Sequence, residues 1–404
     1  MPKMSEFPEK RKDAPVQKAW MNREHPLRIV ELCLNRALGG LELYMARLSG
    51  HLSRRGHRVV PVVEGSGLLA GQSEFTGLPL EAIPLRWVYL DPAGLIRLAG
   101  LVRRFRPHII HLHRAQDLPM AVLARRLGGG GKLVFTLQIE SKRKKQDPYH
   151  RWLYGQLDAL VVVTRRLQHL VQQSLPVSRE KIHQIYYGVD RTRFRPNPLL
   201  RSVWREHLGI GAGQTVIGLV GRLEPGKGHL IFLEAAAQVS RRLPHLRFVM
   251  IGSETAGRTG FRDLLEARVR ELGLVKQVRF LDHQQRIHEL LPMLDVVVLA
   301  SRKETFGLAL VEAMAAGAAP IGTNAGGVPE IIEHNRNGLL VPPEDAEALA
   351  RALFKLAGDG GKRRRLARAA RRTVEQKFDL DEHLNRLEAL FLQLSRGGAR
   401  GTSG

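Results

Sequence analysis

The sequence predicts an α/β protein made of two doubly wound, Rossmann-like domains that face each other across a cleft. Short apolar segments of strand length alternate with helical patterns along the chain, which is typical of parallel sheets covered by helices on both faces. The alternation runs through twice, and its two series meet at Arg195-Pro196-Asn197-Pro198, where two prolines interrupt regular structure. The length of 404 residues fits two domains of roughly 100–200 residues each.

The first series opens with the apolar segment 27–34, which predicts a buried strand. Gly39 and Gly40 follow in a loop, and a helical pattern then continues to about Ser53. Further strands of this domain are predicted at 58–63, 108–112, 133–137 and 159–163.

The second series predicts strands at 215–220, 246–251, 278–281 and 295–300, again separated by helices. Such sheets bind ligands outside the carboxyl ends of their strands, so functional residues are expected in the loops there. The resulting division is a polar extension at 1–25, a first Rossmann-like domain at 26–192, a second Rossmann-like domain at 193–376, and a C-terminal helix with a tail at 377–404.

The composition is that of a globular protein, with 44% hydrophobic and 25% charged residues, which excludes a disordered chain, a collagen and a disulfide scaffold. Cys33 is the single cysteine of the sequence, so an intrachain disulfide and a cysteine zinc site are both excluded. A reducing, cytoplasmic compartment fits this cysteine count. The sequence has no apolar run of the ~18 residues that a membrane span needs, and residues 1–20 lack the apolar core of a secretory signal.

The formal charge of +24 is the one abnormal number, and it predicts an anionic partner: nucleic acid, acidic lipid headgroups or a phosphorylated substrate. Residues 101–200 hold 19 Lys and Arg residues against 6 Asp and Glu residues, with the densest cluster at 142–145. A second basic run at 362–372 lies in a helical pattern and is interpreted as a solvated helix face.

The segment Gly221-Arg222-Leu223-Glu224-Pro225-Gly226-Lys227-Gly228 lies between a predicted strand and a helix that starts near His229. Glycines let the backbone approach a phosphate, and the N-terminus of the helix favours an anion. Arg222 and Lys227 add a forked cation and a point charge. The spacing is not that of a Walker loop. A turn with solvated charges is the alternative, but the order of strand, loop and helix favours a diphosphate site.

A second motif, from Glu304 to Glu312, follows the strand predicted at 295–300, and its helix is expected to begin near Phe306 or Gly307. At 1.5 Å per residue the two carboxylates lie at most ~12 Å apart, which suits hydroxyl groups on either side of a diphosphate. The backbone amides of Phe306, Gly307 and Leu308 would meet the phosphates between them. The alternative is a glutamate that complements the helix dipole and a second, incidental one.

His111-Leu112-His113 closes a strand of the first domain, and residues two apart on a strand point to the same face. A metal site would need further ligands, which the sequence does not make evident. Histidines without a catalytic role are the other alternative.

The two motifs, together with Gly326-Gly327-Val328-Pro329-Glu330 and Asn337-Gly338-Leu339-Leu340-Val341-Pro342, occur in this order at sensible distances. In this respect the chain resembles the retaining glycosyltransferases of the GT-B fold, family 4, also called glycosyl transferases group 1. The resemblance covers about residues 26–395 and is most specific between 215 and 345. It implies transfer of a sugar from a nucleoside diphosphate sugar to an acceptor hydroxyl with retention, and a terminal helix around 381–395 that crosses back to the first domain.

The resemblance also implies roles for individual residues. Arg222 and Lys227 would contact the donor diphosphate beside Gly221, Glu304 would bind the donor sugar, and Glu312 would hold the ribose. The amides of Phe306, Gly307 and Leu308 would complete the phosphate cradle, and Gly39-Gly40 would approach the diphosphate or the acceptor. His113 would face the donor sugar through its ring or its backbone carbonyl. No metal and no other cofactor is expected, because cations and helix dipoles would stabilise the leaving diphosphate.

Three positions depart from the family pattern. Gln138 stands where many members have a histidine, Tyr187-Gly188-Val189-Asp190 replaces Asn-Gly-Val-Asp, and Ser301 lacks its usual preceding proline. The resemblance makes residues 26–192 the acceptor-side domain and residues 193–376 the nucleotide-sugar-binding domain. The first two departures lie in the acceptor-side domain, so they weaken any transfer of acceptor identity.

The basic first domain predicts an anionic or lipid-linked acceptor. The first choice is an acceptor of lipopolysaccharide, exopolysaccharide or glycolipid assembly. Residues 142–145 are then expected to bind the inner face of the membrane peripherally. The runner-up is a soluble acceptor, such as a sugar phosphate or a glucan. A dinucleotide fingerprint is excluded at 65–71 because the glycine spacing has one residue too many, and at 209–213 because the glycines precede a predicted strand instead of following one. A nucleic-acid-binding protein is the least favoured class, since aromatic residues make up only 6% of the sequence and none interrupts the 142–145 cluster.

Overall fold

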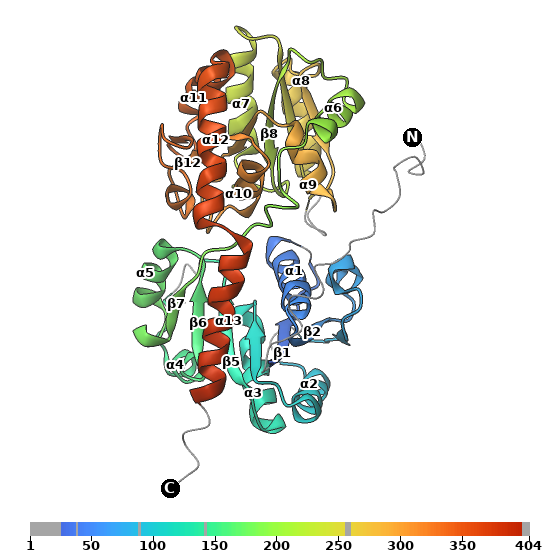
Figure 1. Cartoon of the computed structure of the whole chain (residues 1–404), viewed down its shortest axis with the longest axis vertical. Helices are drawn as coiled ribbons and strands as arrows, with labels where there is room; N and C mark the ends of the chain where they lie inside the picture. The colour runs from blue at the N-terminus through green and yellow to red at the C-terminus, as the bar shows by residue number, and fades with distance from the viewer. Residues whose placement is uncertain (1–25, 38, 88–89, 141–143, 255–259, 398–404) are drawn as a thin grey trace.

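The computed structural model describes residues 26–37, 39–87, 90–140, 144–254 and 260–397 (Figure 1). The extension predicted at 1–25, the tail from residue 398 on, and Lys142 and Arg143 of the basic cluster lie outside the described residues.

Two parallel sheets form the two lobes seen in Figure 1. The first, in the order β3-β2-β1-β4-β5-β6-β7, is parallel throughout, as is the second, in the order β10-β9-β8-β11-β12-β13. The strands of the first are β1 (Arg28–Cys33), β2 (Arg58–Glu64), β3 (Glu81–Ile83), β4 (Ile109–Leu112), β5 (Lys132–Leu137), β6 (Ala159–Val162) and β7 (Ile182–Gln184), and those of the second are β8 (Thr215–Val220), β9 (Leu246–Ile251), β10 (Val278–Leu281), β11 (Val296–Leu299), β12 (Ala319–Thr323) and β13 (Leu339–Val341). The predicted α/β class is confirmed.

Helices connect these strands and cover both sheets (Figure 1). In chain order they are α1 (Gly40–Arg54), α2 (Pro92–Phe105), α3 (Leu118–Gly128), α4 (Pro148–Gly155), α5 (Arg165–Ser174), α6 (Pro198–His207), α7 (His229–Ser240), α8 (Phe261–Glu271), α9 (Ile287–Leu290), α10 (Leu308–Ala315), α11 (Ala346–Gly358), α12 (Gly360–Lys377) and α13 (Leu380–Gly397).

The strands that the sequence predicted are observed to within one or two residues, and four others were missed. The missed strands are β3, β7, β12 and β13, which are three to five residues long. Short strands carry little periodicity, and β12 contains Pro320 and Gly322, two residue types that argue against a strand. The helix expected to begin near Phe306 or Gly307 begins at Leu308, because Gly307 has a φ of 105° and cannot continue a right-handed helix.

The central strands are buried on both faces, which explains their nearly continuous apolar sequences. Strand order reverses between β1 and β4 and again between β8 and β11. At such switch points the loops after adjacent strands diverge and leave a crevice. The loops with the predicted motifs follow β4, β8 and β11, at these points.

Helix α13 continues from α12 and runs along the first lobe (Figure 1). Arg55, at the end of α1, places Nη2 2.6 Å from Asp381 Oδ1 and Nη1 3.0 Å from Glu388 Oε2. His57 lies 3.1 Å from the other Glu388 oxygen. The last described helix is therefore held against the first lobe by the buried Arg55, His57 and Glu388 and by the exposed Asp381.

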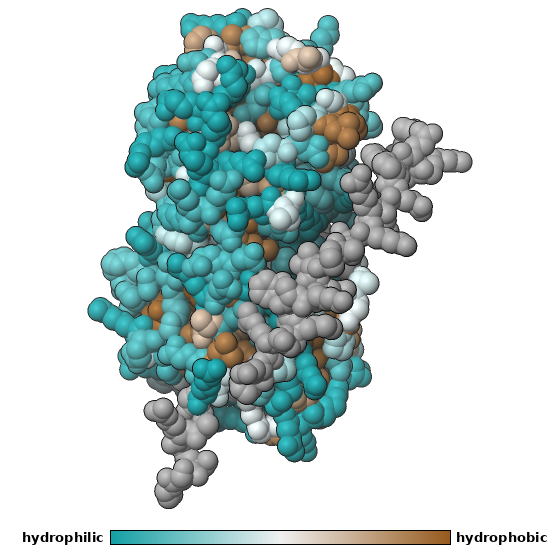
Figure 2. All heavy atoms as spheres, viewed as in Figure 1, coloured by the Kyte–Doolittle hydropathy of each residue, from teal (hydrophilic) through white to brown (hydrophobic). Residues whose placement is uncertain are grey.

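Among the described residues, no helix is both long and apolar enough to cross a membrane. The face shown in Figure 2 is mostly hydrophilic, with small, scattered hydrophobic groups in place of a continuous apolar face.

Candidate active site

The loop between β8 and α7 brings Lys227 to Glu304. Lys227 Nζ lies 3.0 Å from Glu304 Oε2, and the two side chains are 25% and 18% exposed. The loop reaches this position by packing against the end of β11: a Cβ built on Gly228, which has a φ of 79°, would lie 2.1 Å from the carbonyl oxygen of Ala300. Two residues that the sequence assigned to one site are thus in direct contact.

The loop that carries Glu304 is held by the segment Gly326-Gly327. The Gly327 N–H donates to the Glu304 carbonyl at 2.8 Å. A Cβ built on Gly326, which has a φ of 60°, would lie 1.9 Å from that same oxygen. Glu304 is therefore positioned by backbone packing as well as by Lys227.

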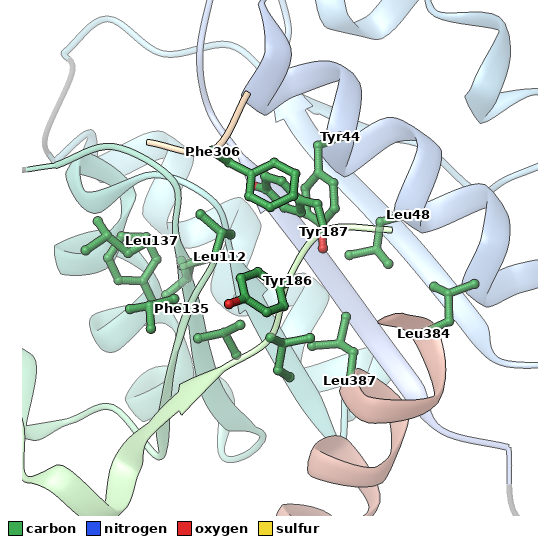
Figure 3. Packing of buried hydrophobic residues seen from close by; sticks show 14 of the residues in the cluster. Tyr44, Leu48, Leu112, Phe135, Leu137, Tyr186, Tyr187, Phe306, Leu384 and Leu387 are labelled. Carbon is green, nitrogen blue, oxygen red and sulfur yellow. The ribbon is translucent and has the colours of Figure 1, made fainter. Parts of the chain in front are cut away.

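The N-terminus of α10 opens beside this loop. Gly307 is the N-cap of α10, and its carbonyl accepts the N–H groups of Leu310 and Val311, so the amides of Leu308 and Ala309 have no acceptor within the helix. The backbone therefore offers hydrogen-bond donors next to Glu304. The Phe306 side chain is buried and points away into the lobe junction (Figure 3).

Glu312 lies on α10, but its partner was not predicted. Arg47 of α1, in the first lobe, places Nη1 2.7 Å from Glu312 Oε1. Both residues border a cavity of about 150 Å³ between the lobes, which is also lined by Leu308 and by the connecting segment from Gly188 to Phe194. The second glutamate of the motif thus faces the junction of the two lobes.

Arg222 reaches toward the glycine loop of the first lobe. A Cβ built on Gly39 would lie 3.6 Å from Arg222 Nη1, whereas one built on Gly40 would meet nothing within 4 Å. The Arg222 guanidinium also pairs with Glu224 at 3.3 Å and is 46% exposed. Gly39 and Arg222 therefore approach each other across the cleft, and Gly221 lies at the base of the same loop.

Below the first-lobe face of the cleft, His111 and His113 share a buried carboxylate. Glu31 Oε2 lies 2.6 Å from His113 Nε2, and Glu31 Oε1 lies 3.1 Å from His111 Nδ1. Thr136 Oγ1 is 2.7 Å from the remaining His111 nitrogen, and Gln138 Nε2 is 3.3 Å from His113 Nδ1. Both imidazole rings are thereby held inside the lobe.

Titration of this cluster follows from its burial. Burial lowers the pKa of His113 to about 4, with His111 acting in the same direction and Glu31 opposing it. Burial by itself would raise the pKa of Glu31, but His111 and His113 outweigh it and hold that pKa below its ordinary value. At neutral pH a charged Glu31 therefore accepts one hydrogen bond from the Nε2–H group of a neutral His113.

Glu31 supplies the third potential metal ligand that the sequence did not reveal: its oxygens and one nitrogen from each of His111 and His113 lie within 4.8 Å of one another. Two ligands of one tetrahedral zinc ion, each at about 2.0–2.1 Å, lie roughly 3.3 Å apart. The 2.6 Å between Glu31 and His113 is instead a hydrogen-bond distance. Hydrogen bonds therefore account for this cluster as it stands.

An aromatic cluster joins the lobes beneath the site (Figure 3). The Tyr187 ring lies 4.4 Å from Tyr44 and 5.3 Å from Phe306, measured between centroids. Phe306 in turn lies 5.5 Å from Phe378 at the end of α12. Tyr187, which departs from the family pattern, thus fills the junction with an aromatic ring.

Glu330 connects the glycine segment of the second lobe to the first lobe. Its carboxylate accepts the backbone N–H groups of Arg165 at 2.9 Å and Arg166 at 2.8 Å, at the start of α5. The Tyr186 hydroxyl donates to the same carboxylate at 2.7 Å. The contact places a negative charge at a helix N-terminus, where it is favourable.

Sequence reasoning found the charged residues of the second lobe and missed Glu31 and Arg47. A carboxylate within the apolar run 27–34 was an available signal, because a buried charge needs partners. Arg47 carried no such signal, since an arginine on an amphipathic helix is usually solvated. The departure at Gln138 did mark a real contact, with His113.

Comparison with known proteins gives two adjoining family matches. The family described as "Glycosyl transferases group 1" matches residues 201–373, and "Glycosyltransferase Family 4" matches residues 38–193.

The D-inositol 3-phosphate glycosyltransferase of Rhodococcus jostii is 32% identical over 83% of this chain and 81% of its own length. The lipopolysaccharide core biosynthesis mannosyltransferase LpcC of Rhizobium leguminosarum bv. viciae is 28% identical over 79% of this chain and 86% of its own length. With the D-inositol 3-phosphate glycosyltransferase of Nocardia farcinica the match is 30% identical and spans 48% of that protein.

Among solved structures, Anabaena Alr3699/HepE in complex with UDP-glucose superimposes with a TM-score of 0.81 over 91% of this chain and 100% of that one, at 23% identity. WaaG, a glycosyltransferase involved in lipopolysaccharide biosynthesis, gives a TM-score of 0.69 over 90% of this chain and 99% of that one, at 18% identity. At these identities the likeness concerns the fold, and it confirms the predicted two-lobed GT-B architecture.

Proposed function

The chain belongs to the glycosyl transferases group 1, glycosyltransferase family 4, and on that premise we propose that it moves a sugar from a nucleoside diphosphate sugar to an acceptor hydroxyl with retention at the anomeric carbon. The observation that carries this proposal is the Lys227–Glu304 pair beside the open N-terminus of α10. A nucleoside diphosphate sugar has a diphosphate and a hydroxylated sugar. The cation and the helix amides suit the diphosphate, and the adjacent carboxylate suits the hydroxyl groups.

In the proposed reaction the bond between the anomeric carbon and the diphosphate oxygen breaks, and its electron pair leaves with the diphosphate. The acceptor oxygen bonds to the same face of the anomeric carbon, and its proton passes to the departing phosphate oxygen. Arg222, Lys227 and the α10 amides stabilise the charge that develops there, so no resident metal or protein nucleophile is assigned. Glu304 positions the sugar, and Glu312 holds the ribose.

His113 acts in this proposal through its backbone. Its two ring nitrogens are occupied by Glu31 and Gln138 inside the lobe. The carbonyl of His113, at the carboxyl end of β4, is the group left to face the positive charge that develops on the sugar. Glu31 then acts as a positioning residue for the end of that strand.

A screen of UDP-, GDP- and ADP-sugars for hydrolysis and thermal shift would identify the donor. Turnover should vanish in Glu304→Ala and persist in Glu333→Ala, an exposed glutamate that pairs with Arg336. Arg222→Ala should weaken binding of the nucleoside diphosphate by about 1–3 kcal/mol, the range for a charged hydrogen bond. A glycosyl adduct trapped on Glu304, an inverted product by NMR, or activity abolished by EDTA would contradict the mechanism.

For the acceptor we propose an anionic or lipid-linked molecule of lipopolysaccharide, exopolysaccharide or glycolipid assembly, met at the cytoplasmic face of the membrane. The mannosyltransferase LpcC among the relatives and the basic first lobe support this choice. Helix α4 follows the 142–145 cluster, and its Tyr149 and Trp152 side chains are 52% and 40% exposed. The Arg126 guanidinium lies over the Trp152 ring, 5.4 Å from the ring centroid. Aromatic and basic side chains together are typical of membrane interfaces.

The basic cluster contributes unequally to that surface. Lys144 is exposed, whereas Lys145 Nζ lies 3.2 Å from the Tyr154 hydroxyl and burial lowers the Lys145 pKa.

Flotation with anionic liposomes at low salt should fall when residues 142–145 are replaced by serine, and further when Trp152→Ser is added. Unchanged flotation would contradict membrane association.

The alternative acceptor is a soluble phosphorylated molecule, of the kind in the name of the D-inositol 3-phosphate glycosyltransferase among the relatives. Transfer to a sugar phosphate without liposomes would support it, and transfer only to a lipid-linked acceptor would exclude it. Tight, salt-dependent retention on DNA without nucleotide-sugar turnover would instead indicate a nucleic-acid-binding protein.

A further inference from the structure

One oxygen of Glu312 is held from the opposite lobe. Arg47 Nη1 lies 2.7 Å from Glu312 Oε1, and the two side chains are 21% and 8% exposed. A hydrogen bond between charged groups in such a partly buried setting is stronger than one at the surface. Among the described residues Glu312 Oε2 accepts no hydrogen bond and forms no ion pair, although Arg193 lines the cavity between the lobes and its charge also acts on this carboxylate. The carboxylate is therefore fixed through one oxygen and available through the other.

The pair lies where the lobes meet. Arg47 is on α1 of the first lobe and Glu312 is on α10 of the second, and both line the cavity between the lobes. Arg47 Nε is buried and has no acceptor among the described residues, so the same guanidinium keeps a second donor. Since the two helices belong to different lobes, this contact exists only when α1 is docked against α10.

We propose that Arg47 is a positioning residue that orients Glu312 toward the donor ribose, so that the ribose hydroxyls are held fully only when the lobes are docked. This inference rests on the proposed function, in which Glu312 holds the ribose. A carboxylate that is already fixed loses less rotational freedom when the ligand arrives, and such preorganisation increases affinity. Recognition of the donor by the second lobe is thereby coupled to the position of the first.

The test compares binding of UDP, GDP and ADP with their 2′,3′-dideoxy counterparts by titration calorimetry on the full chain. The wild type should prefer the ribose form of whichever diphosphate binds. Arg47→Gln should lower that preference about tenfold, since it removes a charged hydrogen bond from Glu312, and should leave the affinity for the dideoxy form within about twofold. A purely structural defect would weaken both forms alike.

Three further variants make the test specific. Arg47→Met keeps the length without the charge and should give the same loss, and it replaces Arg47→Gln if that variant fails to fold. Arg47→Lys keeps the charge and should restore part of the preference. Arg104→Gln, at an exposed position of α2 where the guanidinium pairs with Glu81, does not line this cavity and should keep the wild-type preference.

The two proposals fail in distinguishable ways. Loss of the preference in Glu312→Gln with a wild-type preference in Arg47→Gln would overturn the role of Arg47 and leave the donor site intact. Tighter binding of the ribose form by Arg47→Gln than by the wild type would also overturn the role of Arg47, because Arg47 would then compete with the ribose for Glu312. An unchanged preference in Glu312→Gln, or no binding of any of the three diphosphates, would overturn the donor site and this inference with it.

Discussion

On the second-lobe side of the cleft, loops lie against one another so closely that a Cβ at Gly228 or Gly326 would fall about 2 Å from a carbonyl oxygen. On the first-lobe side Gly40 has open space around it, and the end of β4 is held instead by buried side chains, Glu31, His111 and His113. At these positions the second lobe fixes its site through backbone contacts, whereas the first lobe fixes the end of β4 through a polar network in its core.

This difference determines how each side responds to change. A backbone contact without space for a Cβ tolerates almost no substitution at the glycine, whatever the pH. A buried network of histidines and a carboxylate tolerates neighbouring substitutions better, but it depends on the protonation state of its members. Mutations and pH can therefore perturb the two sides separately.

The largest effect should come from Gly326→Ala. The new Cβ would lie 1.9 Å from the Glu304 carbonyl oxygen at a φ of 60°, so the loop that carries Glu304 must move. We expect the free energy of unfolding to fall by at least about 3 kcal/mol, with a loss of kcat/KM of roughly 100-fold or more because Glu304 is displaced. Urea denaturation and donor hydrolysis measure the two effects.

Gly40→Ala is the matched control for stability on the other side of the cleft. A Cβ at Gly40 meets nothing within 4 Å, and alanine favours the helix that begins there, so Tm should stay within about 2 °C of the wild type or rise. Equal destabilisation by both alanines would contradict the backbone-fixed description of the second lobe.

The same contrast explains how much could be predicted from the sequence. The Gly221–Gly228 loop and the Glu304–Glu312 motif are contiguous segments. Their glycines and charged residues indicate a phosphate or sugar site, and the neighbouring apolar runs indicate that each segment follows a strand, so both could be predicted from local patterns. The pairs Arg47–Glu312 and Arg165–Glu330 join residues 265 and 165 positions apart. Such contacts depend on how the lobes pack, and no local pattern specifies that.

Acidification should affect the first-lobe network next. Burial lowers the pKa of His113 and of His383, in α13, to about 4, below the 6.5 expected in the unfolded chain. The unfolded state thus binds protons at a higher pH, so stability is lost as the pH falls from about 6.5 toward 4. Each of these histidines contributes up to about 3 kcal/mol to that loss, measurable as urea midpoints between pH 7.5 and 4.5.

His113→Gln should remove the His113 share of this pH dependence, because glutamine does not titrate in the range, and should leave the share of His383. His169→Gln, at an exposed position of α5, should leave the slope unchanged. Hydrogen exchange at pH 5 should show lost protection in β1, β4 and β5 beyond that seen at pH 7.5. A pH dependence that is the same in the wild type and in His113→Gln would contradict the role of this buried network.

The smallest effect is expected where the two sides are joined, at Glu330. Glu330→Gln keeps the shape of the side chain but removes the negative charge that accepts the amides of Arg165 and Arg166, so the free energy of unfolding should fall by about 1–2 kcal/mol. Because the lost contact lies between the lobes, small-angle scattering should show a larger radius of gyration, while α5 keeps its own cap from Thr164. Glu333→Gln removes a carboxylate three residues away whose ion pair is with the exposed Arg336, so it should change neither quantity measurably. Both variants could instead lose the same stability, with no increase in the radius of gyration for either. In that case Glu330 does not help to hold the two lobes together, and the aromatic junction of Tyr44, Tyr187 and Phe306 holds the second-lobe loop against the α5 end of the first lobe.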